Sequence, residues 1–191
     1  MIMDMRTLIP SLLSLILLPA LADAQDRWFT KSGRIRFDAT AKGSPEEVVG
    51  NHPAIVCVLD TKTGALQFSA LVKGFQFKAA LMEEHFNENY MESTKFPKAE
   101  FRGTVLDNAS VNYGKDGTYP VRVKGNLTIH GVTREVTADG QLVVGGGKVA
   151  ARSTFKVPLA DHAVKVPKIV ADKLATVAKV SVDCSLEPLK Q

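Results

Sequence analysis

The sequence has few of the residues and motifs from which catalytic, redox and metal sites are commonly built. Only two of its 191 residues are cysteine, Cys57 and Cys184, and they form neither a CxxC redox motif nor a CxxCH haem motif. The four histidines include no pair with metal-ligand spacing such as HExxH. The sequence also lacks a GxSxG nucleophile elbow and a glycine loop that opens a helix. We therefore predict that the protein is not an enzyme and has no metal and no cofactor.

Strong charge of one sign is also missing. The net charge is only +4, and the basic side chains alternate with apolar ones, which is typical of a solvated outer face. Nucleic acid is therefore not a predicted partner. Transient contact with an anionic membrane surface stays open, and so does the oligomeric state, including a dimer.

The sequence has no apolar run long enough to cross a bilayer comfortably, but it has a shorter one near the start. Arg6 precedes an apolar run over residues 8–18, and small residues follow up to Ala24. This order is typical of a secretory signal peptide. We expect cleavage after Ala24, with Ala22 as the second choice, so residues 1–24 are a signal peptide and residues 25–191 one domain. No cysteine follows the cut, so we predict a periplasmic or secreted protein without a lipid anchor.

The clearest structural pattern is the strict alternation in the segment 119–133. Apolar residues and one glycine occupy the odd positions from Tyr119 to Ile129, and polar ones occupy the even positions from Arg122 to His130. Such alternation predicts a half-buried antiparallel strand, with Gly131 in the turn that follows.

Similar segments separated by turn signals predict about eight strands. They lie within residues 32–42, 51–60, 65–78, 99–107, 119–129, 132–144, 148–159 and 176–189. Short connections imply antiparallel pairing, in a closed barrel or a sandwich. Gly103 and Gly125 on the inward face favour strong bending and thus a barrel. Residues 79–93 repeat apolar side chains at helical spacing and predict a short helix over one mouth, and residues 161–173 predict a long connection.

Polar side chains offer few alternatives. The histidines are expected on polar faces, with His130 serving its turn. The adjacent Glu84 and His85 allow only a weak hypothesis of acid–base catalysis, because neighbours on a helix point apart. Cys57 and Cys184 lie in two predicted strands, either as a disulfide or as two buried thiols.

The inward-facing phenylalanines are a stronger lead. They predict either an ordinary packed core or an elongated apolar cavity, since an eight-stranded barrel is just wide enough to hold one slender ligand. Small inward residues such as Gly103, Gly125, Ala138 and Ala151 would leave room for it.

Two blocks of the sequence resemble the YceI-like family. The segment GNLTIHGVTREVT, residues 125–137, is similar to the family's strand-and-turn signature. The segments MEEHF, residues 82–86, and ESTKFPKAEF, residues 92–101, resemble its central block, and DHAVKVP, residues 161–167, resembles the segment before its last strand. The order and spacing of these blocks also fit, and together they span nearly the whole chain after residue 24.

The resemblance implies an all-β fold, an extended eight-stranded antiparallel β-barrel similar to lipocalins, with a short helix capping one mouth. It also implies a non-catalytic periplasmic protein that holds a long apolar ligand, such as a polyisoprenoid, an isoprenoid quinone or a fatty-acid derivative. Within this framework we predict cavity-lining side chains and a lid made by Leu81, Met82 and Phe86. The predicted ligand-binding residues are Phe75, Phe77, Leu81, Met82, Phe86, Phe101, Val123, Leu127 and Phe155. The competing hypothesis is a filled barrel that acts as a structural or stress-response interaction protein without a ligand.

Overall fold

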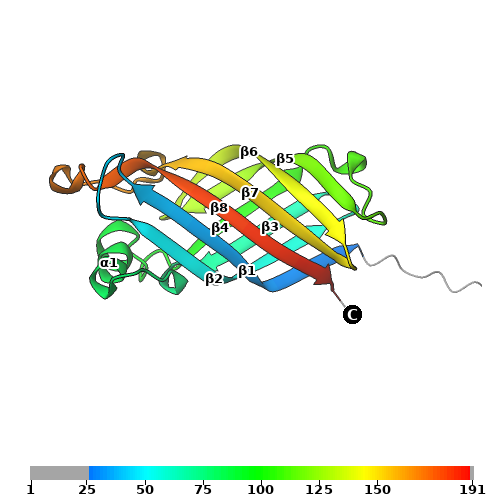
Figure 1. Ribbon diagram of the computed structural model, residues 1–191, viewed down its shortest axis with the longest axis horizontal. Helices are drawn as coiled ribbons and strands as arrows, with labels where there is room; N and C mark the ends of the chain where they lie inside the picture. Colours follow the sequence, from blue (N-terminus) through cyan, green and yellow to red (C-terminus); the bar gives the residue numbers. More distant parts are fainter. Residues whose placement is uncertain (1–25, 190–191) are drawn as a thin grey trace, which may run out of the picture.

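A computed structural model describes residues 26–189 and shows a closed antiparallel barrel (Figure 1). Each strand pairs with the next along the chain, and the last strand pairs with the first. The strands are β1 (Arg27–Thr40), β2 (Val49–Asp60), β3 (Ala65–Leu71), β4 (Lys98–Val105), β5 (Gly117–Ile129), β6 (Val132–Gly145), β7 (Lys148–Pro158) and β8 (Leu174–Pro188). The predicted eight-stranded barrel is confirmed, and the sandwich alternative is wrong.

The predicted signal peptide and the outermost residues of the predicted domain lie outside the described range. Within residues 26–189, no helix is both long and apolar enough to cross a membrane.

The two ends of the barrel are built differently. At one end lie both ends of the described chain and the tight turns β2–β3 and β6–β7, together with a loop that contains η3 (Asn108–Ser110). The other end carries two long segments. One contains η1 (Val72–Gly74), α1 (Ala80–His85) and the π-helical turn η2 (Phe86–Tyr90), and the other contains η4 (Leu159–His162) and η5 (Lys168–Val170). Figure 1 shows both segments at the end opposite the C-terminus. We call it the open end, and the opposite one the closed end.

The β5–β6 hairpin confirms the alternation predicted from sequence. Its register runs without a shift from Gly117 opposite Val144 to Ile129 opposite Val132. The two turn residues, His130 and Gly131, have φ angles of 50° and 72°. Two positive φ angles define a turn whose twist matches that of paired strands. This turn places His130 at the open end of the barrel.

The predicted third strand ends earlier than the sequence pattern suggests. β3 stops at Leu71, and Phe75 and Phe77 flank an isolated bridge between Gln76 and Asn51. The cause is the turn η1, in which Gly74 lies so close to the buried His52 ring that a Cβ atom would overlap it. The two phenylalanines still point inward, but from a segment that departs from the regular sheet.

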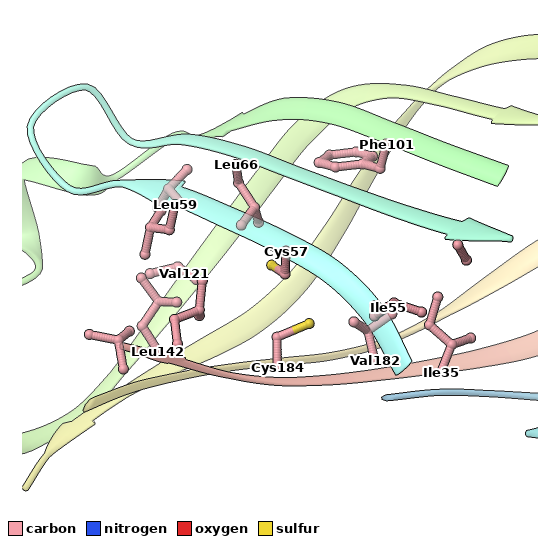
Figure 2. Close-up of a cluster of buried hydrophobic side chains, with 14 of the residues drawn as sticks. Ile35, Ile55, Cys57, Leu59, Leu66, Phe101, Val121, Leu142, Val182 and Cys184 are labelled. Carbon is pink, nitrogen blue, oxygen red and sulfur yellow. The ribbon is translucent and has the colours of Figure 1, made fainter. Parts of the chain in front are cut away.

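Aliphatic side chains fill the closed half of the interior (Figure 2). Leu59, Val149 and Leu186 have no exposed surface, and Leu142 and Val105 have almost none. Gly103 and Gly125 face each other across β4 and β5 so closely that a Cβ on Gly125 would overlap the Gly103 Cα. The expectation that these glycines leave room for a ligand is therefore wrong, because they serve the close approach of two strands.

Both cysteines are buried thiols in the structure, one of the two alternatives left open by the sequence. Figure 2 shows their side chains directed into the same interior space from β2 and β8. Between these strands, β1 is irregular around Gly33, where an added Cβ would lie 2.8 Å from the Cys184 sulfur. A hydrogen bond with the Cys184 thiol, followed by burial, raises the pKa of Cys57 well above its ordinary value. The pair thus behaves as part of the packed core.

Candidate functional site: an apolar cavity in the open half

The open half of the barrel contains a cavity of about 440 Å³ with an almost entirely apolar lining. Seven of the nine predicted ligand-binding residues line it: Phe75, Phe77, Leu81, Met82, Phe86, Leu127 and Phe155. The structure does not bring Phe101 and Val123 to this cavity. They line a second space of only about 60 Å³, deeper in the barrel.

A floor of aromatic rings separates the two spaces. Phe68 and Phe155 border both of them. Phe101 stacks on Phe68 with the ring centroids 5.1 Å apart and an interplanar angle of 16°. Phe101 itself is buried, and its ring lies over Gly103, where a Cβ would overlap it. The cavity is therefore a blind pocket that ends at these rings and does not run through the barrel.

Four phenylalanines form a cluster in the wall and lid. Phe86 from η2 stacks on Phe37 from β1 at 5.3 Å and lies 5.4 Å from Phe75 and 4.9 Å from Phe77. Contacts of this geometry between aromatic rings are attractive beyond the burial of their area. They hold the helical segment over the barrel, which confirms the prediction of a short helix capping one mouth.

The capping segment is also fixed by hydrogen bonds. The Glu83 carboxylate accepts a bond from the Phe77 backbone N–H at 3.3 Å, and the Asn87 side chain donates to the Glu83 carbonyl at 2.9 Å. Leu81 is 61% exposed although it borders the cavity, whereas Met82 and Phe86 are half-buried. The three predicted lid residues thus lie at the mouth, with Phe86 deepest.

The charged side chains that border the cavity lie at its rim. The Lys173 ammonium pairs with the Glu46 carboxylate at 2.9 Å and joins the β1–β2 loop to the segment before β8. The hydrogen bond and the charge of Glu46 raise the pKa of Lys173. His85 also borders the cavity, from the exposed side of α1. An apolar chain would therefore lie inside, with any polar end directed to this rim.

The expectation that the histidines lie on polar faces is wrong for two of them, His52 and His162, which are only 5% and 2% exposed. His52 packs under η1 and donates a hydrogen bond from Nε2 to the Leu71 carbonyl at 3.0 Å, while its Nδ1 accepts from the Ala54 N–H at 3.2 Å. Burial lowers the pKa of His52. His162 lies in η4 and borders the cavity.

His130 does lie in its turn, as predicted, but its side chain does more than complete the turn. Its Nε2 lies 2.7 Å from the Glu92 carboxylate and its Nδ1 lies 3.2 Å from the His162 carbonyl. The imidazole thereby connects three open-end segments: the capping segment, the β5–β6 turn and η4. Glu92, His130 and Ala163 are also the non-glycine residues with positive φ in the described chain. Such backbone conformations persist where surrounding contacts hold them.

Comparison with known proteins agrees with this architecture. The sequence model of the YceI-like domain matches residues 28–187. The chain belongs to the YceI-like family. No curated protein sequence matches it.

Solved structures show that this YceI-like chain shares its fold with several bacterial proteins. A polyisoprenoid-binding domain from Saccharophagus degradans, implicated in plant cell wall breakdown, superposes with a TM-score of 0.72 at 12% identity, over 86% of this chain and 99% of that one. BcnA from Burkholderia cenocepacia gives 0.64 at 14% identity, over 81% and 95%. The YCEI protein from Campylobacter jejuni gives 0.54 at 16% identity, over 78% and 88%. At these identities the likeness concerns the fold alone.

Several cavity residues of this YceI-like protein were missed by sequence reasoning. Phe37, Ile129 and Val180 border the cavity although they are not among the predicted ligand-binding residues. His162 and Val164 lie in the segment that was expected to be only a connection. In the structure His162 and Val164 are buried between exposed neighbours, but two positions in an irregular segment form no sequence pattern that could have indicated this burial.

Proposed function

We propose that this protein is a non-catalytic periplasmic carrier that holds one long apolar molecule, such as a polyisoprenoid or a fatty-acid derivative, in the open half of its barrel. The observation that carries the proposal is the blind apolar cavity of about 440 Å³. An empty space of this size lined by phenylalanine and aliphatic side chains favours an apolar occupant over water. Each buried CH₂ group contributes roughly 0.8 kcal/mol, so a long chain needs few specific contacts.

The family supports the same proposal. The domain from Saccharophagus degradans that shares this fold over 86% of the chain binds polyisoprenoids. We extend this type of ligand to the present protein because apolar side chains line the cavity and aromatic rings form its floor. The signal-peptide pattern of residues 1–24 supports a location outside the inner membrane.

Catalysis has less support from the site. Glu84 and His85 are both exposed on α1, and no hydrogen bond or ion pair joins these two described side chains. His85 lies beside the cavity, so the catalytic hypothesis can be tested there. If the protein is not an enzyme, replacement of His85 by Asn should leave the chemical structure of any co-purifying molecule unaltered.

The alternative of a filled barrel without a ligand fits only half of the molecule. The closed half is packed by buried side chains, but the open half is not. A purely structural role gives no physical reason for leaving a cavity under an aromatic lid, since empty space of this size costs stability.

The direct test is to purify the protein from its native compartment, extract it with organic solvent and analyse the extract by mass spectrometry. The proposal predicts a long-chain apolar molecule in near-stoichiometric amount. An empty extract, together with no binding of long-chain alcohols or acids to the purified protein, would overturn it.

A further inference from the structure

His162 is a polar side chain in the apolar wall of the cavity. It is 2% exposed and borders the cavity from η4. The neighbouring wall is made by Leu159, Val164 and Ile129, none of which offers a side-chain hydrogen bond. A buried imidazole in such surroundings needs partners for both ring nitrogens, because an unsatisfied polar atom loses its hydration without compensation.

One ring nitrogen has its partner within the protein. Nδ1 of His162 lies 3.0 Å from the Val132 carbonyl oxygen at the start of β6. A carbonyl oxygen only accepts, so Nδ1 carries the proton and donates. In the neutral imidazole the other nitrogen, Nε2, then carries a lone pair and is an acceptor.

The backbone of His162 is also fixed by contacts with neighbouring segments. Nδ1 of His130 lies 3.2 Å from the His162 carbonyl oxygen, and Nε2 of His130 lies 2.7 Å from the Glu92 carboxylate. Ala163, the next residue, has a φ of 56°, in the left-handed region. The hydrogen-bonded chain from Glu92 to His162 therefore fixes the orientation of the imidazole as well as its tautomer.

The second ring nitrogen has no such partner. Among residues 26–189, no group forms a hydrogen bond with Nε2 of His162, and the atom is not among the fully enclosed ones. Because the two ring nitrogens point in divergent directions, Nε2 does not face the Val132 carbonyl that Nδ1 contacts. The open space that the ring borders is the cavity.

We propose that Nε2 of His162 accepts a hydrogen bond from a hydroxyl group at the head of the bound chain. The inference rests on the proposed function and narrows its ligand class to long-chain alcohols, the shared chemistry of isoprenols and fatty alcohols. An ether or an oxidised quinone presents only acceptors to Nε2, and two lone pairs facing each other in an apolar site repel. The hydroxyl lies near the mouth, while the chain extends toward the floor at Phe68 and Phe155.

The test compares two probes that differ in one hydrogen-bond donor, farnesol and farnesyl methyl ether. Any bound ligand is first removed from the protein by extraction with organic solvent. The affinities of the two probes for this ligand-free protein are then measured by displacement of a fluorescent apolar dye. We expect farnesol to bind about fivefold more tightly, which is the effect of one hydrogen bond to a buried acceptor. An oxidised short-chain isoprenoid quinone should behave like the ether.

One substitution distinguishes the role of Nε2 from that of Nδ1 in His162. In His162→Asn, the side-chain amide can still donate to the Val132 carbonyl from the Nδ1 position, but no acceptor remains at the Nε2 position. The affinities for farnesol and for the ether should then become about equal. The affinity for the ether should stay at its wild-type value, which would show that the cavity is intact. Glu88→Gln, at an exposed position of η2 that is not part of the cavity lining, is the control and should keep the full preference.

The outcomes are distinct. Equal affinities of the wild type for farnesol and its ether, or tighter binding of the ether or quinone, would overturn the role of His162 and leave the carrier function standing. Retention of the preference in His162→Asn would do the same. Binding of neither probe to the wild type would overturn the carrier function, and this inference with it.

Discussion

The two halves of the barrel use the same strands for opposite purposes. In the closed half, side chains such as Leu59 and Leu186 belong to one packed core and leave no surface exposed. In the open half, Leu127 and Phe155 reach inward from the same kind of strand but border a cavity of about 440 Å³. The difference lies in what covers each end. Two tight turns and the η3 loop cover the closed half, whereas the capping segment covers the open half through its aromatic contacts.

The largest contrast is expected between two leucines of equal burial, Leu59 at 0% and Leu127 at 3% exposure. Leu59→Ala should lower the free energy of unfolding by about 4 kcal/mol, and Leu127→Ala by about 2 kcal/mol, because Leu127 already faces empty space and loses fewer contacts. Urea denaturation of the ligand-free protein measures both. An equal or larger loss for Leu127→Ala would mean that the open half is as tightly packed as the closed half.

The boundary between the halves can be moved. Phe101→Ala should remove the support of the floor and join the cavity to the 60 Å³ space beneath it, so that a longer chain is bound. Each additional buried CH₂ should then increase affinity by about fourfold beyond the wild-type limit. Binding of linear alcohols of increasing length measures the limit. Leu59→Ala is the control, and an unchanged limit in Phe101→Ala would show that other residues form the floor.

Acid should weaken the open end through His52. Burial holds the pKa of this imidazole below its ordinary value of 6.5, so the unfolded chain binds a proton at a higher pH than the folded protein does. The free energy of unfolding should therefore fall as the pH drops below 6.5 and stop falling below the folded pKa. Urea denaturation on both sides of pH 6.5 measures this effect. His52→Gln should lack this component, and an identical pH dependence in that variant would contradict the assignment.

The ion pair between Glu92 and His130 should slow the escape of a ligand, because it ties the capping segment to the β5–β6 turn. Glu92→Gln keeps the shape of the side chain and removes the charge, so the dissociation rate of a bound fluorescent fatty acid should rise about threefold. Stopped-flow displacement measures the rate. Glu88→Gln, at an exposed position in η2, is the matched control. Equal dissociation rates in the two variants would show that the pair of Glu92 and His130 does not control the escape of the ligand.

The smallest expected effect is on membrane binding, because only the open end is expected to contact a membrane surface. Ile169 in η5 is 89% exposed next to Lys168, while Leu106 at the closed end is 50% exposed. Ile169→Ser should reduce sedimentation with vesicles rich in phosphatidylglycerol by about twofold, because an apolar side chain and nearby lysines favour an anionic surface. Leu106→Ser should have no effect. Equal reductions in both variants would rule out an oriented contact.

The sequence predicts the barrel well, but it does not show which inward-facing residues belong to the closed half and which to the open half. Alternation along residues 119–129 correctly separates inward from outward side chains, and the turn at Gly131 is where it was expected. The same alternation places Val123 and Leu127 on one face without telling which half of the barrel each reaches. That division depends on the stagger between strands, on the close pair Gly103 and Gly125, and on the irregular β1 near Gly33.

The polar part of the site was hidden for a different reason. His162 belongs to an irregular segment, where no periodicity indicates which side chains are buried. Its partner His130 was recognised as a turn residue, because one strand cannot show that its ring contacts two distant segments. Contacts between loops that lie far apart in sequence are a property of the closed barrel and not of any single segment.

The central claim is that one half of the barrel is a blind apolar pocket for a single chain. It is tested most directly by the affinity of the ligand-free protein for linear alcohols of increasing length. The account predicts saturable binding whose affinity rises about fourfold per added CH₂ and then stops rising once the chain reaches the aromatic floor. An absence of saturable binding at every length, or an affinity that rises without any limit, would contradict it.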